Sequence, residues 1–536
     1  MPALTPGVRA AVLGAWISAA KVVLFTVGSA SFLTGRPAAE LAWVYLGLAA
    51  LAAGSAVAMA PRLERLPPAR SLVRLLLASI AATLALALGL AGDVPGSSCA
   101  LLILAHLYNI ASEIVFWLVV AAWLPPPELR RATVWICLAA ALGGFAGGLA
   151  VERLLVLGPA AALTVGTLAA ALGALIALRT GDRAIRPAVD ERSVDADTAT
   201  PAPEIRWREV LANPLGPPLG AAAFLLTLVW SMTEFMCLAR YQELYSPAEL
   251  GPQLARIFAV LQLVEFACIL LLSGPATRWV PPAWRSVLFP LGALATLQLL
   301  GLHATEPQGS TGPPLWPILV AHAYTEAASN ALFDPVHASN VAAVPARLQA
   351  RLRAFSDGIC YPMGMAAGAV VLLAAQSDAD SLELTLLLAT TAAMLFVGVG
   401  IFTGTMIGPS LLNELGLTAE VGALPSRGEL RAALRTLAPW ARRSGLRDRL
   451  LARLRDGPAS DDLRLRVERA DRRALRAAFA LARRCDPGGP TARLETLLDS
   501  RSPERRALVV EAVLSLPLRR LFLPFVPALR RRYLPG

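Results

Sequence analysis

A single lysine, Lys21, is present in this chain of 536 residues, and it lies inside a long apolar stretch. An ionisable group inside an apolar segment that crosses a membrane is costly to bury, so it marks a candidate functional site. A lysine there offers a compact positive charge to an anionic ligand or to a carboxylate at the same depth. The structural alternative is that its long stem carries the charge to the membrane surface. Because Lys21 lies about halfway along its segment, we favour the functional interpretation.

Two further apolar segments carry polar side chains at helical spacing. The first set is spaced i, i+3, i+7 and the second i, i+4, i+8, so each set shares one face of a helix. The two sets are His106, Asn109 and Glu113, and then His322, Glu326 and Asn330. Because exposing such groups to lipid is unfavourable, both faces are predicted to look inward. The alternative to a ligand site is that they hydrogen-bond to one another and hold helices together.

Four other residues complete the candidate set. Glu234 and Glu265 lie within apolar segments, and burial at the midplane disfavours a charged carboxylate, which suits proton coupling. Asp357 lies near the start of its segment, where a structural or gating role is as well supported as ligand contact. Trp117 follows Glu113 by one turn, so its ring either stacks on a planar ligand or packs in the core.

Signatures of enzymes and pumps are missing from the sequence. A phosphate-binding loop needs a lysine after glycine, but the only lysine follows two alanines. There is no HExxH, no GxSxG and no CxxC pair, and the six cysteines lie far apart. The sequence therefore predicts no enzyme, no ATP-driven pump, no metal site and no cofactor.

The composition is that of an all-α membrane protein. Hydrophobic residues make up 56% of the chain and charged residues 16%, and the mean hydropathy is +0.57. Apolar stretches of about 20 residues are long enough to cross a bilayer as helices. Twelve spans are predicted near residues 11–33, 39–60, 71–91, 99–123, 132–150, 157–178, 217–238, 252–273, 286–303, 315–333, 355–375 and 383–405. Because Lys21 interrupts the first span, we expect that span to be retained and not cleaved as a signal peptide.

The loops between these spans differ in arginine content. Alternate loops hold 17 arginines on one side and four on the other. Positive residues collect on the cytoplasmic side, so both termini are predicted to be cytoplasmic, in a bacterial inner membrane. A missed or invented span upstream would destroy the alternation, which therefore supports the number of spans as well.

Four regions follow from this pattern. They are a six-helix half at 1–178, a polar linker at 179–214, a second six-helix half at 215–408 and an arginine-rich helical region at 409–536. From Leu424 onward the tail carries 26 Arg against 12 acidic residues, so the rest of the chain has a net charge of −3. This distribution favours anionic lipid headgroups over nucleic acid as the partner of the tail. Its amphipathic helices are compatible with HEAT-type repeats and with a protein partner.

The two halves show a trace of duplication. Ala105, His106, Tyr108 and Ala111 recur as Ala321, His322, Tyr324 and Ala327 at a constant offset of 216. Two six-helix repeats are one arrangement found in secondary transporters, with the substrate site between the repeats. Glycines four residues apart are predicted to allow close helix approach: Gly143 with Gly147, Gly144 with Gly148, and Gly364 with Gly368.

Three stretches resemble the ATP/ADP translocase-like branch of the major facilitator superfamily, also called the Tlc or nucleotide transporter family. They are LYNIASEIVFWLVVAAWLPPPELRR from Leu107, TLVWSMTEFMCLARYQELY from Thr227, and ALFDPVHASNVAAVPARLQARLRAFSDGICYPMG from Ala331. The resemblance implies a two-domain facilitator fold that works by alternating access. It also implies roles in nucleotide exchange for Lys21, Glu113 and Glu265. The family's second lysine, near the end of the membrane domain, has no counterpart here.

We therefore expect a secondary-active transporter for an organic anion, such as a nucleotide or phosphorylated metabolite. In this hypothesis Lys21 contacts the anion and the glutamates couple to protons or to a counter-substrate. An exporter of hydrophobic compounds is a second transporter hypothesis. It predicts that transport does not depend on Lys21. The alternative from another class is a non-transporting membrane anchor or sensor whose cytoplasmic helical domain binds a protein partner.

Overall fold

The computed structural model describes most of the membrane region and part of the tail. The described residues are 5–65, 67–124, 126–180, 207–273, 280, 282–304, 315–342, 344, 346–375, 381–414, 435, 437, 460–485, 490–498, 500, 506, 509–510, 512–513, 519–526 and 529. All the regular elements among them are helical.

Six long helices form the first half, and they coincide with the first six predicted spans. They are α1 (Pro6–Gly35), α2 (Leu41–Arg65), α3 (Pro68–Ala91), α4 (Ser97–Trp123), α5 (Pro126–Leu154) and α6 (Pro159–Thr180). Four of them begin with a proline. Proline has no amide hydrogen, and the amide hydrogens of the first helical turn have no partner within the helix, so nothing is lost there. Large apolar side chains such as Leu88 and Trp135 are exposed on the outside of the bundle, as expected where lipid is the solvent.

The second half matches the remaining six predicted spans. It consists of α8 (Gly216–Leu244), α9 (Pro247–Cys268) with η3 (Ile269–Ser273), α11 (Pro282–Ala304), α12 (Leu315–Ala323) with η4 (Tyr324–Phe333) and α13 (Asp334–Ala342), α14 (Ala346–Phe355) with η5 (Ser356–Cys360) and α15 (Tyr361–Ala375), and α16 (Ser381–Glu414). Eleven spans in the described residues meet a length and hydropathy criterion for crossing a membrane. The predicted span at 315–333, formed by α12 and η4, is not among them, and it carries polar residues that lower its hydropathy, such as Glu326 and Asn330.

Segments of π-helix distinguish the second half. η3, η4 and η5 are π-helical, whereas the described helices between residues 5 and 180 contain no such segment. A π-helix inserts extra residues into a turn and is found most often at functional sites. Glu326 and Asn330 lie in η4, Asp357 lies in η5, and Glu265 precedes η3 by one turn.

The two halves meet along α1, α2 and α5 from the first and α8, α9 and α15 from the second. Gly148 of α5 allows this approach, because a methyl group there would lie 2.8 Å from the Ala259 side chain of α9. Within the halves, methyl groups at Gly143 and Gly364 would lie 2.1 Å from the Ala15 carbonyl oxygen and 2.0 Å from that of Phe224. The close helix contacts predicted from glycine spacing at these positions are confirmed.

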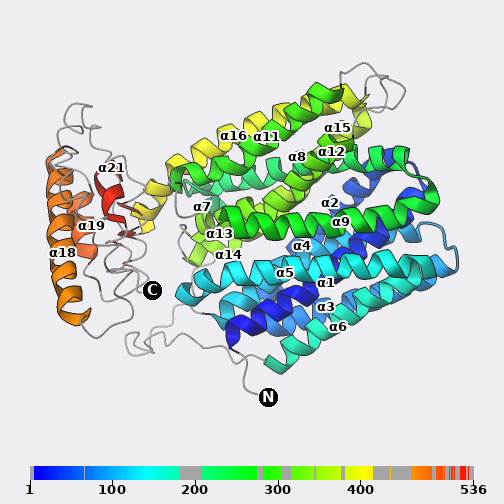
Figure 1. Cartoon of the computed structure of the whole chain (residues 1–536), viewed down its shortest axis with the longest axis horizontal. Coiled ribbons are helices and arrows are strands. Elements are labelled where there is room, and N and C mark those ends of the chain that lie inside the picture. The colour runs from blue at the N-terminus through cyan, green and yellow to red at the C-terminus, as the bar shows by residue number, and fades with distance from the viewer. Residues whose placement is uncertain are drawn as a thin grey trace.

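The chain on either side of the second half departs in detail from the expected boundaries. A short helix, α7 (Trp207–Ala212), lies within the stretch expected to be a linker, and α16 continues past position 408 to Glu414. We call the end of the bundle where α1 begins and α16 ends the near end, and the end with the α1–α2 connection the far end. The tail lies beyond the near end (Figure 1).

The described part of the tail is helical. It contains α18 (Ser460–Cys485), α19 (Thr491–Leu497), α21 (Arg519–Phe522) and η6 (Leu523–Phe525). The helical character predicted for the region at 409–536 is confirmed for these elements, whereas much of the rest of that region lies outside the described residues. One apolar core joins α18 and α19 to residues at the near end of the second half, among them Val341 and Ile407.

The outer face of α18 carries exposed arginines: Arg469, Arg472, Arg473, Arg476 and Arg483. The buried face of α18, including Leu475 and Phe479, packs toward α19, α21 and η6. These elements lie between α18 and the membrane helices (Figure 1). The arginine face of α18 therefore points away from the bundle.

Candidate functional site

Lys21 lies halfway along α1, and its side chain is partly buried. The charged groups within its electrostatic range include three carboxyls from the other half of the molecule: Glu265 of α9, Glu326 of η4 and Asp334 of α13. The lysine thus faces the interface between the halves. This position is the one expected of a lysine that pairs with intramembrane carboxylates.

Glu265 is held by two amide side chains. Gln262 of the same helix donates from Nε2 to Oε2 at 3.1 Å, and Asn330 of η4 donates from Nδ2 to the same oxygen at 2.9 Å. Glu265 is 7% exposed. Two of the predicted residues, one from each of two spans, are therefore in direct contact, and their shared bond fixes η4 against α9.

Asp334 belongs to the same charged group, although sequence reasoning did not select it. Lys21, Glu113, Glu265 and Asp357 all lie within electrostatic range of its carboxyl group. The Phe-Asp-Pro sequence was assigned to a connection between spans, but the helical run from Leu315 to Ala342 carries Asp334 one turn beyond Asn330. We call Lys21, Glu113, Glu265, Asn330 and Asp334 the central cluster.

A second buried group lies around Glu234 of α8. Tyr45 of α2 donates its hydroxyl to Glu234 Oε2 at 2.8 Å, and Trp230 donates Nε1–H to Glu326 Oε1 at 2.6 Å. The His106 ring meets Trp230 edge to face at 5.7 Å and Tyr45 at 6.1 Å between centroids. We call these five residues the Glu234 cluster. It joins α2 and α4 of the first half to α8 and η4 of the second.

The two duplicated histidines occupy similar aromatic surroundings. Phe25 of α1 contacts His106 at 4.9 Å between centroids, and Tyr241, which lies 216 residues after Phe25, contacts His322 at 5.8 Å. Phe258 touches both Phe25 and His322, at 5.0 Å and 5.7 Å. Tyr241 OH also lies 3.1 Å from His322 Nδ1. The 216-residue offset that relates α4 to the α12–η4 segment thus also relates Phe25 to Tyr241. This further pair supports the duplication.

Other predicted residues lie apart from these clusters or on their edge. Trp117 packs on Phe116, with ring centroids 5.4 Å apart, and joins the core of the first half. Trp117 therefore packs in the core, which was the alternative to stacking on a ligand. Asp357 lies 3.4 Å from His337 Nε2 and accepts a hydrogen bond from Ser356 at 2.7 Å. Asn109 lies one turn after His106 and is partly exposed.

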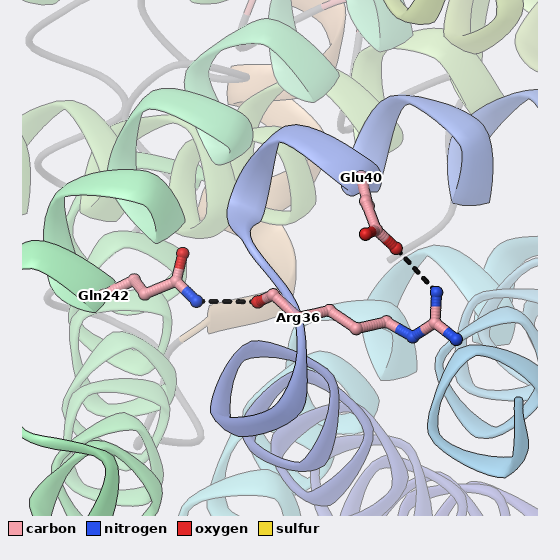
Figure 2. Close-up of polar contacts among 3 residues, drawn as sticks. All are labelled: Arg36, Glu40 and Gln242. Atoms are coloured by element: carbon pink, nitrogen blue, oxygen red, sulfur yellow. Dashed lines mark hydrogen bonds and ion pairs between the residues drawn. The ribbon is translucent and has the colours of Figure 1, made fainter. Parts of the chain in front are cut away.

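The far end is closed by Gln242, which sequence reasoning also missed. Its amide Nε2 donates to the carbonyl oxygens of Leu33 and Arg36 at 2.6 Å and 2.7 Å, and its Oε1 accepts from the Ala38 amide at 2.7 Å. Arg36 is in turn bound to Glu40 across the same turn, at 2.6 Å (Figure 2). One side chain of α8 therefore satisfies three backbone groups of the α1–α2 connection. No local sequence pattern predicts this contact.

A second polar contact joins the halves near the same end. Arg256 of α9 donates to Glu152 Oε1 of α5 from Nε at 3.1 Å and from Nη2 at 2.7 Å. Both side chains are partly exposed, so this pair is worth about 0–1 kcal/mol and is weaker than its geometry implies. Together with Gln242 it joins the two halves near the far end.

The chemistry of the central cluster is that of charge recognition. One cation from the first half lies within electrostatic range of several carboxyls of the second half. Among the described residues, no group of three or more histidines, cysteines or acidic residues has the arrangement of a metal site.

Replacing Asn330 with leucine is expected to lower stability by about 1–3 kcal/mol, because buried Glu265 would lose one of its two donors. The midpoint of thermal unfolding of the detergent-purified protein measures this change. Ser329→Ala is the matched control, since that hydroxyl donates only within its own helix, to the Glu326 carbonyl. Equal midpoints for the two variants would show that the Asn330–Glu265 bond contributes nothing.

Solved structures similar to this chain are transporters. A POT family transporter in complex with 5-aminolevulinic acid aligns with a TM-score of 0.53 and 12% identity, over 74% of this chain and 96% of that chain. A POT family transporter in complex with a thioalcohol-conjugated peptide gives a TM-score of 0.52 and 11% identity, over 74% and 96%. A bacterial homologue of the iron transporter ferroportin, in the outward-facing state with soaked iron, gives 0.50 and 16%, over 75% and 99%.

At such low identity these comparisons establish the fold alone. The chain has the expected major facilitator-like architecture of two six-helix halves, with a helical C-terminal region. No family model matches the chain, and no curated protein sequence matches it. The ATP/ADP translocase-like branch and the HEAT-type tail therefore rest on sequence resemblance and pattern.

Proposed function

We propose that this protein is a secondary transporter that works by alternating access and carries a solute with an anionic group, such as a nucleotide or phosphorylated metabolite. The observation that carries the proposal is Lys21, placed halfway through its helix and facing carboxyls of the opposite half. A site between two halves is exposed to one side of the membrane or the other when the halves rock. The fold is shared with solved transporters.

The central cluster supplies a physical basis for coupling. The Lys21 ammonium lies within electrostatic range of the Glu265, Glu326 and Asp334 carboxyls. An arriving anion competes with these carboxyls for the same lysine. A carboxyl that loses this partner inside the bilayer becomes more costly to keep charged, so it takes up a proton or is neutralised by a counter-substrate. Solute binding and carboxyl charge are thus linked through Lys21.

The orientation of the protein is also proposed. The arginine-rich loops lie at the near end, so this end and both termini face the cytoplasm of a bacterial cell. The far end, closed by Gln242, then faces outward. The resemblance to nucleotide transporters supports a nucleotide as the first solute to examine, with Glu113 and Glu265 as additional contacts.

The proposal is tested by thermal stabilisation of the detergent-purified protein with nucleotides, other anionic metabolites and neutral solutes. Selective binding raises the unfolding midpoint, by about 2.7 kcal/mol in free energy at a ligand concentration 100 times Kd. We expect one anionic class to stabilise the protein and Lys21→Ala to abolish the shift. Arg9→Ala is the control, because it removes a cation from the exposed start of the same helix. Stabilisation by neutral solutes, equal in both variants, would contradict the anion site.

The exposed arginine face of α18 favours a second candidate, a membrane anchor or sensor whose cytoplasmic region binds an acidic protein partner. This candidate predicts that a folded protein is stabilised by no solute in the panel. The inward-facing central cluster favours transport, because an anchor needs no charged group at that depth.

A further inference from the structure

Glu234 is buried with one carboxyl oxygen left unpartnered. The residue is 1% exposed, and its Oε2 accepts the Tyr45 hydroxyl, while its Oε1 has no hydrogen-bond partner. An ionised carboxylate accepts several hydrogen bonds, and leaving one oxygen bare away from water is costly. A neutral carboxylic acid is much less costly to bury with one oxygen unpartnered than a charged carboxylate is. The geometry therefore fits the protonated form.

The groups that face Glu234 supply no positive charge to offset an anion. It accepts the hydroxyl of Tyr45 from α2, and within its electrostatic range lie the Glu326 carboxyl of η4, the Tyr361 hydroxyl of α15 and the Cys237 thiol of its own helix. The one acid among these, Glu326, carries the same charge as an ionised Glu234. It accepts a hydrogen bond from Trp230. A like-charged neighbour adds to the cost of ionising Glu234.

His106 provides a second unpartnered atom in the same cluster. It is 2% exposed, and its Nε2 has no hydrogen-bond partner. Its ring contacts that of Tyr45, which is the residue bonded to Glu234. Two titratable side chains, each nine-tenths or more buried and each with a bare polar atom, are thus joined through Tyr45 between the two halves. A proton is small enough to enter this packed space, and binding it to Glu234 removes the buried negative charge.

We infer that Glu234 is a proton-binding site of the carrier, separate from the anion contact at Lys21. This inference rests on the proposed transport function. Uptake converts the carboxylate and one proton from solution into a neutral carboxylic acid, and release reverses it, so no other reactant is needed. The proton enters when the far end opens and Glu234 meets water.

Through the Tyr45–Glu234 hydrogen bond, protonation of Glu234 affects whether the two halves are closed or open at the far end. Tyr45 belongs to the first half and Glu234 to the second, so the bond forms only when the halves close at this depth. Closing removes water from Glu234, which the neutral form tolerates and the charged form does not. Proton uptake therefore favours the far-closed state, and opening toward the near end must precede release.

The test is infrared difference spectroscopy of the lipid-reconstituted protein as pH is varied across about pH 5 to about pH 8, where protonation switches operate. It needs no transported solute, so it is independent of the solute panel. The carbonyl-stretch band of a protonated carboxyl should appear as the pH falls and should be absent in Glu234→Gln. Glutamine keeps an acceptor for Tyr45 and the same shape, so this variant should fold.

Two variants separate a proton site from a structural role. Glu243→Gln changes an exposed glutamate on the same helix, paired with Arg240, and should keep the band. Tyr45→Phe should keep the band but shift its frequency, because the hydrogen bond to the carboxyl is lost. A titrating band that survives in Glu234→Gln would overturn the inference. So would a Glu234 band that does not change with pH, since a permanently neutral acid carries no proton across.

Discussion

Replacing Gln242 with leucine is expected to open the far end of the molecule. Leucine has a similar size but cannot make the three bonds to Leu33, Arg36 and Ala38. At about 0.5–1.5 kcal/mol each, the loss is roughly 2–4 kcal/mol, and those backbone groups would also lose their partner. Since the bonds join the two halves, their loss weakens the far-closed state relative to the far-open one. A shift of that size changes the population ratio by more than about tenfold.

The opening is measured by labelling Cys237 with a membrane-impermeant maleimide in a variant whose other cysteines are replaced. Cys237 lies on the same helix, is fully buried and belongs to the apolar core between the halves. It is therefore shielded while the far end is closed. We expect labelling to be at least about tenfold faster in Gln242→Leu, in line with the population shift.

Glu243→Gln is the control for this experiment, because the Glu243 side chain is exposed and accepts a hydrogen bond from Arg240 on its own helix. Its labelling rate should equal that of the unmodified protein. Equal rates in Gln242→Leu and Glu243→Gln would show that Gln242 does not hold the far end closed. A solute that slows labelling in Gln242→Leu would connect the central cluster to this closure.

The second large effect is expected from Gly143→Ala. The added methyl carbon would lie 2.1 Å from the Ala15 carbonyl oxygen, 2.6 Å from its carbonyl carbon and 2.7 Å from its Cα. All three are backbone atoms, so relief requires α1 and α5 to move apart. Overpacking of this kind costs about 1–3 kcal/mol and occasionally more. Because α1 carries Lys21, the shift should also displace the cation from the opposing carboxyls.

Thermal unfolding and yield of monodisperse protein measure the effect. Gly398→Ala in α16 is the matched control, because a methyl group there meets nothing within 4 Å. Alanine favours a helix over glycine by up to about 1 kcal/mol, so the control should be neutral or stabilising. An unfolding midpoint for Gly143→Ala as high as that of Gly398→Ala would contradict the close contact between α1 and α5.

Much of the fold was predictable because it depends on properties that are local in sequence. Hydropathy over a window of residues located the eleven membrane-length spans, and the four-residue glycine spacing predicted the close contacts at Gly143, Gly148 and Gly364. The π-helical segments were not foreseen. They arise where helix contacts favour an extra residue in a turn, and the sequence of η4 shows the same apolar and polar mixture as an ordinary helix.

The candidate site was predictable in part for the same reason. Lys21 and Glu265 were selected because a charged residue within an apolar segment can be recognised from the sequence alone. Asp334 was missed because it was placed in a connection, beyond the predicted end of its span. Asn330 was selected from its helical spacing, but its partner Glu265, which lies 65 residues earlier, could not be deduced from that spacing.

The sequence by itself determined that this chain is an all-α membrane protein with two related halves, because burial in lipid imposes a length, a composition and a helical backbone on each span. Only the tertiary structure decided which charges face each other, that Gln242 closes the far end, that Glu234 is left with a bare oxygen, and that the arginine face of α18 turns away from the membrane helices. These properties depend on contacts between residues as much as two hundred positions apart, such as Tyr45 with Glu234. Such contacts are selected by the packing of whole helices, which no local pattern encodes.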